Sequence, residues 1–391
     1  MPSIEEVLKH HSVLHAEYKP SYKIHGFAVD ESNSNSSTCV TYIEDSLGLT
    51  PATNNVTTFN GGSWLDEYPF NAIRIVALDN GGNVIGEVMQ DNFNKFTDGT
   101  DTTNKNLFVE IPPVYWKFTQ TANGYEVRWS GEQVDADYKA MAHSRGGTLK
   151  GNLYIAVYEG YRSGNVFSCS TGKTITNSVS LSQIREAINS TFGATSGFEP
   201  FSYYSVMLLQ ILFVSMFKTL NSQSIFQGRT GGSAITTSGN LNLNGLYYGS
   251  SSSASYAMKF MGIEHLWGNY STLIDGILVS GSGQVRINDK SVTNVTTSDY
   301  QDPVSVVDAS ASYIKSVVAT TEAGFLNDSA QYTTSTTYYT DTQRFHSNYP
   351  YFTFGGSYND GSKAGIFFLE AYWGLTETSA YNCGRLEYLP W

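Results

Sequence analysis

The octapeptide Gly262-Ile263-Glu264-His265-Leu266-Trp267-Gly268-Asn269 combines two glycines and a tryptophan with three polar side chains. Two later runs have the same character: residues 354–368, Phe-Gly-Gly-Ser-Tyr-Asn-Asp-Gly-Ser-Lys-Ala-Gly-Ile-Phe-Phe, and residues 382–386, Asn-Cys-Gly-Arg-Leu. Tyrosine, tryptophan, serine and asparagine are the side chains of adaptable binding surfaces. We therefore expect these runs to form a binding surface, and nothing comparable in the chain points to a chemical reaction.

The composition favours β structure with uncharged polar surfaces. The chain has 391 residues, of which 14% are aromatic and 15% are charged, whereas about 25% charged residues is usual. Serine, threonine, asparagine and glycine take the place of the missing charges. This length is enough for two or three domains, and the composition is typical neither of disorder nor of a coiled coil.

The charge balance argues against several classes of partner. The formal net charge is -12 and the pI is near 5, so we expect no nucleic acid as a partner. The strongly apolar residues 206–217 contain Gln210 and Ser215 and are too short to span a bilayer. The N-terminus has no basic and apolar segments of a signal peptide. We therefore expect no membrane insertion.

The sequence gives little support for a metal, a cofactor or catalysis. The three cysteines, Cys39, Cys169 and Cys383, have no disulfide or zinc spacing. The histidines at 10, 11 and 15 are more typical of a solvated helix face than of a metal site. The remaining enzymatic option is a glycosidase-like pair of Glu264 and Asp275. We expect no catalytic residue, no metal and no cofactor.

Hydrophobic periodicity predicts a mixture of strands and helices. A short amphipathic helix is expected over residues 3–15, and two further helices over residues 183–191 and 202–220. The last of these is apolar around its whole circumference and should be buried. A long loop or a loose hairpin is expected over residues 228–256. The expected strands occupy residues 24–29, 39–43, 72–78, 84–89, 114–118, 125–129, 153–158, 166–169, 273–279 and 285–287.

Three of the expected strand pairs are hairpins. The Asp-Asn-Gly-Gly turn at 79–82 joins the strands at 72–78 and 84–89, and Ala-Asn-Gly at 122–124 joins two strands with one aromatic face. A turn at 162–165 is expected to join the strands at 153–158 and 166–169. Among the later aromatics, Phe352, Phe354, Phe367 and Phe368 are expected in the core. A surface role is predicted for six others: Tyr349, Tyr351, Tyr358, Tyr372, Trp373 and Tyr381.

The three glycine-rich runs resemble C-type-lectin-fold proteins of the formylglycine-generating-enzyme type. Within that group the chain is most similar to phage tail and host-recognition proteins such as the major tropism determinant. Residues 110–117, Glu-Ile-Pro-Pro-Val-Tyr-Trp-Lys, and residues 221–225, Asn-Ser-Gln-Ser-Ile, also resemble phage proteins of this architecture. The resemblance covers roughly residues 105–391. Cys169 and Cys383 do not lie in the active-site motif of the enzymes, so their activity is not expected here.

The resemblance implies an α+β chain with a β-rich N-terminal region, residues 1–104, and a C-type-lectin-like domain of two helices and short antiparallel strands, residues 105–391. The first region would serve attachment or oligomerisation, with a trimer favoured. Scaffold positions would be Gly355, Gly356, Ala364, Gly365, Gly384 and Arg385. Receptor-binding positions would be Ser357, Tyr358, Asn359, Asp360, Tyr372, Trp373, Glu377, Thr378 and Tyr381.

We therefore expect a virion tail protein that binds a host surface glycan or protein and contacts other tail proteins. One alternative is a structural tail or capsid-decoration protein, in which the aromatic face is a subunit interface. Another is a glycan-cleaving tail enzyme that uses Glu264 with a partner carboxylate.

Overall fold

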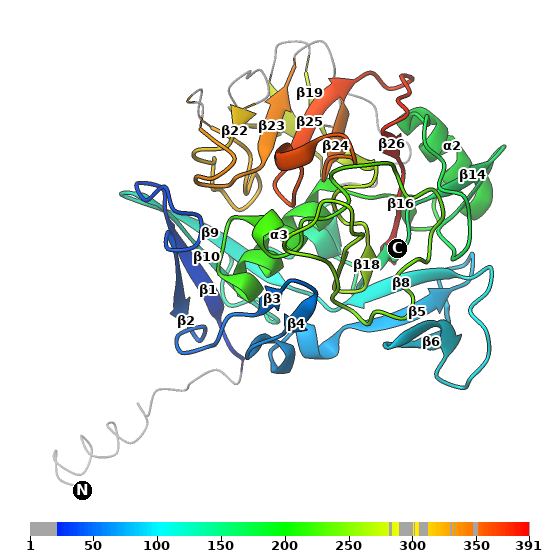
Figure 1. The fold of residues 1–391 in the computed structure, drawn as a ribbon, viewed down its shortest axis with the longest axis horizontal. Coiled ribbons are helices and arrows are strands. Elements are labelled where there is room, and N and C mark those ends of the chain that lie inside the picture. The colour runs from blue at the N-terminus through cyan, green and yellow to red at the C-terminus, as the bar shows by residue number, and fades with distance from the viewer. Residues whose placement is uncertain are drawn as a thin grey trace, which may run out of the picture.

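A computed structural model describes residues 22–280, 284–288, 300, 302–304, 312–328, 331, 333–346 and 351–390 of the chain. The helix expected over residues 3–15 lies outside this part, and so does Tyr349. In the part described, the fold is mixed α+β, with many strands and two α-helices, α2 and α3. The coarse fold class expected from the sequence is thus confirmed. Three sheets surround α3 (Figure 1).

The first sheet has four antiparallel strands, and the N-terminal part of the chain forms half of it. In spatial order the strands are β2 (Val40–Glu44), β1 (His25–Asp30), β10 (Gly124–Ser130) and β9 (Tyr115–Thr121). The hairpin of β9 and β10 is the one expected. Its alternating aromatic side chains are buried on one face, among them Trp116, Tyr125 and Trp129, as a period of two along a strand requires.

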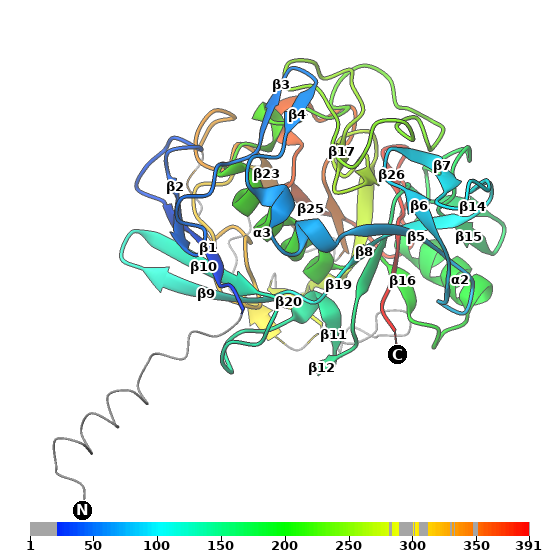
Figure 2. The same ribbon diagram turned by 90° about the horizontal axis from the view of Figure 1, so that it is seen from below.

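The second sheet has seven antiparallel strands. In spatial order they are β16 (Phe198–Pro200), β27 (Leu386–Tyr388), β13 (Leu153–Ala156), β8 (Asn106–Ile111), β5 (Arg74–Leu78), β6 (Val84–Met89) and β7 (Asn92–Phe96). Figure 2 shows this sheet and the four-stranded sheet on opposite sides of α3. The hairpin of β5 and β6 is the one expected from the turn at 79–82.

The boundary expected between residues 104 and 105 falls inside these two sheets. Strand β5 pairs with β8, and β1 pairs with β10, so each sheet contains strands from both sides of the boundary. Side chains from both sides also share one hydrophobic core, which includes Phe27 and Leu208. The described residues before 105 therefore do not form a core of their own.

The third expected hairpin is wrong. Strand β15 (Val166–Ser168) does form a hairpin across the turn at 162–165, but with β14 (Tyr161–Ser163). Strand β13 pairs instead with β8 and β27. All four of its side chains are buried, and a continuous apolar run of this kind is typical of a central strand with neighbours on both sides.

The third sheet has eight strands and carries the C-terminal part of the fold. Along the sheet they are β21 (Asp302–Val304), β20 (Val285–Ile287), β19 (Ser271–Val279), β24 (Tyr351–Phe354), β25 (Leu369–Trp373), β23 (Thr342–Phe345) and β22 (Ser312–Tyr313), and β26 (Asn382–Cys383) also pairs with β19. The β23–β25 and β19–β26 pairs are parallel. The four phenylalanines predicted as core residues are buried.

Short elements complete the chain. The remaining two-stranded pairs are β3 (Thr53–Asn55) with β4 (Thr58–Asn60), β11 (Ser144–Arg145) with β12 (Thr148–Leu149), and β17 (Lys259–Phe260) with β18 (Ile263–Glu264). The 3-10 turns are η1 (Trp64–Asp66), η2 (Phe70–Ala72), η3 (Met141–His143), η4 (Ser222–Ser224) and η6 (Gly361–Lys363). Residues 228–256 contain none of these elements, as expected for a long loop.

Helix α3 (Tyr203–Phe217) is the centre of the molecule, as its apolar sequence predicts. All fifteen of its residues are buried. Ser202 caps its N-terminus by accepting a hydrogen bond from the Ser205 backbone N–H. Helix α2 (Leu181–Phe192) starts with a capping box formed by Ser180 and Gln183. Both helices therefore begin directly after a serine N-cap.

Candidate functional site

The octapeptide at residues 262–269 is entirely buried, so the expectation that it forms part of a binding surface is wrong. Each of its polar side chains has a hydrogen-bond partner among the described residues. Glu264 accepts hydrogen bonds from the backbone N–H groups of Gly239 (3.0 Å) and Asn240 (2.9 Å). These contacts tie the octapeptide to the long loop, which has few apolar side chains to hold it.

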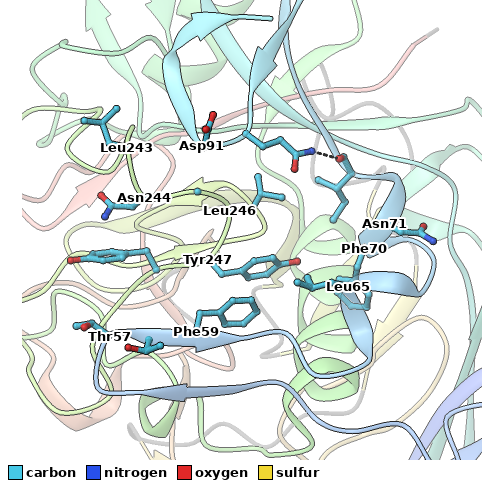
Figure 3. A pocket seen from close by; sticks show the side chains of 15 residues that line it. Thr57, Phe59, Leu65, Phe70, Asn71, Asp91, Leu243, Asn244, Leu246 and Tyr247 are labelled. Atoms are coloured by element: carbon cyan, nitrogen blue, oxygen red, sulfur yellow. Dashed lines mark hydrogen bonds between the residues drawn. The ribbon is translucent and has the colours of Figure 1, made fainter.

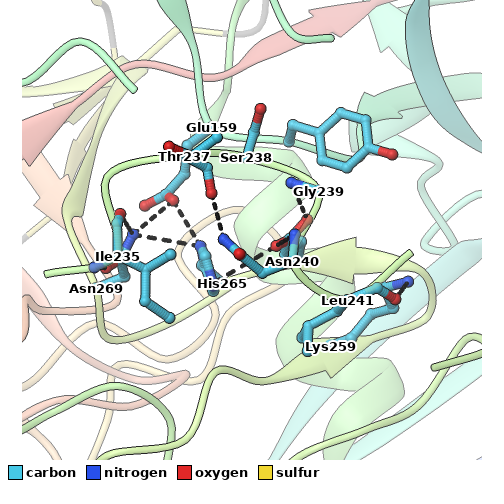
Figure 4. A network of polar contacts seen from close by, with 12 residues as sticks. Glu159, Ile235, Thr237, Ser238, Gly239, Asn240, Leu241, Lys259, His265 and Asn269 are labelled. Atoms are coloured by element: carbon cyan, nitrogen blue, oxygen red, sulfur yellow. Dashed lines mark hydrogen bonds and ion pairs between the residues drawn. The ribbon is translucent and has the colours of Figure 1, made fainter. Parts of the chain in front are cut away.

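A second carboxylate, Glu159, organises the rest of this buried network (Figure 4). Glu159 Oε2 lies 2.7 Å from His265 Nδ1 and accepts a hydrogen bond from the Asn269 side chain at 2.8 Å. Burial alone would lower the pKa of His265, but the adjacent Glu159 carboxylate raises it above its ordinary value. The Glu159 carboxylate therefore favours the protonated form of the imidazole in a pair that is buried from solvent.

Arg385 closes the network from the C-terminal side. Its guanidinium is fully buried and donates to four backbone carbonyls: those of Ala156 and Val157 (both 2.9 Å), Glu264 (2.8 Å) and His265 (3.4 Å). Arg385 thus joins the end of β13 to the octapeptide. This geometry supports the scaffold role that the resemblance implied for it.

Glycine is needed at two of the expected scaffold positions. Gly355 has φ +86°, and a Cβ atom there would lie 2.8 Å from the Leu266 carbonyl oxygen. A Cβ atom at Gly365, which has φ +154°, would lie 2.3 Å from the carboxylate of the buried Asp341. A side chain at either position would clash with these neighbours. Glycine at 355 lets the run at 354–368 lie against the octapeptide, and glycine at 365 lets it lie against Asp341.

Glu264 and Asp275 do not form a catalytic pair. Asp275 is fully buried and receives two hydrogen bonds of 2.6 Å from the Arg185 guanidinium and one of 2.9 Å from the Tyr300 hydroxyl. Glu264 lies in the separate network around residues 239 and 240. Neither carboxylate faces an open cleft, and a glycosidase needs two carboxyl groups flanking an accessible substrate.

The three cysteines are free and buried. Burial raises the pKa of Cys169 to about 12 and that of Cys383 well above its ordinary value. Both are therefore protonated thiols at neutral pH, whereas the thiolate is the reactive form. This chemistry is consistent with treating neither as an active-site cysteine.

Two of the predicted receptor-binding residues, Tyr358 and Tyr381, lie together at the surface. Their ring centroids are 5.5 Å apart, and Tyr381 is 41% exposed. Tyr358 also packs on the buried Tyr270, and the two rings meet edge-on at 6.1 Å. The Tyr358 backbone N–H donates to Asn269 O, and the Tyr381 carbonyl accepts from the Ser271 N–H, both at 2.8 Å. The tyrosine pair, defined as Tyr358 and Tyr381, is therefore anchored at the end of the octapeptide.

The residues next to Tyr358 divide between support and surface. Ser357 is buried, and its backbone N–H and hydroxyl both donate to Asp360 Oδ2, at 2.6 and 2.7 Å. The Ser357 side chain is therefore not accessible for the receptor contact predicted for it. It stabilises the turn at residues 357–360 instead. Asn359 is exposed, and Asp360 is partly exposed. The structure brings these two beside the tyrosine pair in sequence and space.

The other predicted residues lie on β25 and the turn that follows it. Tyr372 is partly buried, with the Arg344 guanidinium 4.0 Å above its ring. The backbone of Trp373 pairs with Tyr351, and its side chain lies outside the part of the structure described. Glu377 and Thr378 are exposed, and Glu377 accepts a hydrogen bond from the Gly374 N–H. The expected surface position of Tyr351 is wrong, because its side chain is buried against the Arg185 guanidinium.

Tyr270 was not predicted from the sequence as part of the site, although it directly follows the octapeptide. It is 4% exposed and packs with Ile175 and Cys383 in a small cluster that Tyr358 and Ala234 cover. Its position directly after Asn269 is the one sequence feature that could have placed Tyr270 in the site. No periodic pattern links it to the distant segments that carry Tyr358 and Tyr381. The ring of Tyr270 thus supports the ring of Tyr358.

The carboxyl group of Glu31 is partly buried, and its titration makes the stability of the fold depend on pH. Glu31 accepts hydrogen bonds from the Val317 N–H (3.0 Å) and the Tyr339 hydroxyl (3.3 Å). Burial raises its pKa from 4.5 to about 7. Between pH 4.5 and about 7, the folded chain therefore keeps this proton, whereas the unfolded chain has released it. The stabilisation is complete below pH 4.5 and is lost as the pH rises through about 7.

We expect Glu31→Gln to match the parent at about pH 4 and to be more stable at about pH 8, by on the order of 1–2 kcal/mol after allowance for partial exposure. Urea unfolding of both chains at the two pH values measures this difference. Glu322→Gln, at an exposed position, is the control for the loss of a carboxylate at the surface. Equal stability of Glu31→Gln and the parent at pH 8 would contradict the prediction.

Two further properties of the described residues concern membrane spans and metal sites. Within those residues, no helix has the length and apolar character needed to cross a membrane. The same residues contain no group of three or more histidine, cysteine, aspartate or glutamate side chains placed to hold a metal ion.

The sequence matches no protein-family model and no curated protein. We therefore infer the function from the geometry of the chain itself.

Proposed function

We propose that the chain is a virion tail protein that binds a host-cell surface receptor, a glycan or a protein, through the tyrosine pair and its neighbours Asn359, Asp360, Glu377 and Thr378. The fold proposed for residues 105–391 is a C-type-lectin-like scaffold. The observation that carries this proposal is the mounting of Tyr358 and Tyr381 on backbone hydrogen bonds at either side of the buried Tyr270.

This mounting suits a binding face for a physical reason. Large aromatic side chains supply contact area at a low entropic cost, and pre-organised anchors of this kind make most of a contact's energy. The loops that carry the tyrosine pair are irregular, while the octapeptide beneath them is rigidly buried. A fixed scaffold with exposed loop side chains is the arrangement expected of a receptor-binding module.

Adsorption of virions to host cells tests the proposal. Tyr381→Ala should reduce adsorption at least tenfold, because truncating a central aromatic anchor typically costs more than about 2 kcal/mol. Its unfolding free energy should stay within about 1 kcal/mol of the parent, as at other surface positions. Tyr256→Ala is the matched control, since Tyr256 is 44% exposed and lies outside both loops. Normal adsorption of Tyr381→Ala would contradict the proposal.

A structural tail or decoration protein is the second candidate. Strand β6 favours it, because Val84 and Ile85 are each 46% exposed and Met89 is 37% exposed. Exposed apolar side chains such as these suit a contact with another tail protein or with a second copy, a trimer in our proposal. Loss of the chain from purified virions carrying Tyr381→Ala would support this candidate over receptor binding.

A further inference from the structure

A pocket lies away from the tyrosine pair, and four separate segments line it (Figure 3). They are the β3–β4 hairpin, the η1–η2 segment, residues 90–91 and residues 243–248. The cavity has a volume of about 840 Å³, which is in the range of pockets for small organic ligands. We call it the hairpin pocket.

The floor of the hairpin pocket is apolar and aromatic. Phe59 and Tyr247 stack on each other with ring centroids 4.4 Å apart and an interplanar angle of 15°. Phe70, Ile73 and Leu246 extend this floor. These side chains are tied to the main core, so the floor is fixed before any ligand binds.

The rim of the pocket is polar and almost uncharged. Thr58, Asn71, Gln90 and Asn244 line it, and Asp91 is the only charged residue among the lining side chains. The amide nitrogens of Asn71 and Gln90 donate to the backbone carbonyls of Asp66 (2.8 Å) and Ile73 (3.0 Å). Their amide oxygens are left as acceptors. With no lysine, arginine or histidine in the lining, the pocket has nothing to neutralise an anionic ligand.

One hydroxyl in the floor lacks a partner. The Tyr247 hydroxyl is buried and makes no hydrogen bond to any of the described residues. Burial also raises its pKa, so it stays a donor at neutral pH. In Figure 3 it points toward Leu65, which is 41% exposed and cannot accept a hydrogen bond. Leaving a buried polar group unpaired is unfavourable, and a ligand oxygen that displaces Leu65 would supply the missing partner.

The hairpin wall of the pocket is held under strain. Val56, at its tip, has φ +57° and is 53% exposed, a conformation that is unfavourable for a β-branched residue. Ser251 fixes it, through a hydrogen bond from the Val56 N–H to Ser251 Oγ and another from the Ser251 N–H to Val56 O. Strain of this kind persists only where surrounding contacts enforce it, and it clusters at ligand sites.

We propose that the hairpin pocket binds a neutral saccharide unit. A sugar ring has an apolar C–H face that matches the aromatic floor, and hydroxyls that match the amide and threonine rim. One of those hydroxyls pairs with Tyr247. An aliphatic side chain of a protein partner would fill the same floor but leave the Tyr247 hydroxyl unpaired. This inference does not depend on the proposed receptor face, because the pocket and the tyrosine pair belong to different segments.

Saturation-transfer NMR on the full chain tests the inference. The probes are methyl glycosides of glucose, galactose and N-acetylglucosamine, with glucuronic acid and sialic acid as acidic comparisons. At least one neutral glycoside should receive saturation on its C–H protons, and the acidic sugars should receive none. No transfer to any neutral glycoside at millimolar concentration, or transfer to the acidic sugars alone, would overturn the proposal.

Two variants locate the binding. Tyr247→Phe removes only the hydroxyl and should weaken saccharide binding at least tenfold. Its thermal stability should not fall, because the hydroxyl has no partner in the protein. Tyr256→Ala, at a residue that is 44% exposed and lies outside the pocket lining, is the control and should bind the saccharide as the parent does. Unchanged binding by Tyr247→Phe would overturn the inference. If Tyr381→Ala alone abolishes binding, the sugar sits at the tyrosine pair, which supports the proposed function and refutes the pocket.

Discussion

Replacing Arg385 with methionine should destabilise the fold by more than about 3 kcal/mol. The substitution removes a fully buried guanidinium that donates to the carbonyls of residues 156, 157, 264 and 265. Each of these carbonyls loses a hydrogen bond from a charged donor, and such bonds contribute about 1.5–3 kcal/mol. Effects within one network are not additive, so the total is smaller than the sum of the four.

Urea unfolding of Arg385→Met beside Arg128→Met measures this effect. Arg128 is the matched control, since its side chain is 26% exposed and pairs with Glu44 and Glu126 at the surface. Pairs of this kind contribute about 0–1 kcal/mol. A change below about 1 kcal/mol for Arg385→Met would mean that the octapeptide does not depend on this clamp.

Asp275→Asn should cost about 3–5 kcal/mol. Asp275 is the counter-charge of the Arg185 guanidinium, which it meets through two bonds of 2.6 Å in the interior. Removing one partner of a buried ion pair leaves the other charge uncompensated, and that penalty dominates the loss.

A double-mutant cycle separates this penalty from ordinary packing. The chain with both Asp275→Asn and Arg185→Met should be more stable than Asp275→Asn alone, because no unpaired charge remains. Glu87→Gln is the control for loss of a carboxylate, since Glu87 is 44% exposed in a surface pair with Arg74. Strictly additive losses in the cycle would contradict an energetically coupled pair.

The parts of the fold that local chemistry determines were predictable. The turn at 79–82 specifies the β5–β6 hairpin, the alternation around Trp116 and Trp129 specifies β9–β10, and a helix apolar on all sides has to be buried. Strand β13 was paired wrongly because its true neighbours, β8 and β27, are distant in sequence. An apolar strand carries no local mark of which partner lies beside it.

The site was predictable only in part, for a related reason. Tyr358 and Tyr381 look like surface residues because small polar residues flank them, and they do lie side by side. Glu264, His265 and Asn269 look equally polar, yet they are buried. Their partners, such as Glu159 and the backbone of residues 239–240, come from segments with no recognisable pattern. Polar composition alone cannot separate a buried network from a binding face.

The interior position of β27 has a consequence for how the chain is made. This strand lies between β13 and β16, and its residues leave the ribosome after those of every other strand in the sheet. Until then, β13 lacks its neighbour on one side, and β16 has no bond to the rest of the sheet. Contacts between residues so far apart in the chain form slowly, and unpaired strand edges promote aggregation in the meantime. Newly made chains are therefore expected to need protection by chaperones until β27 inserts.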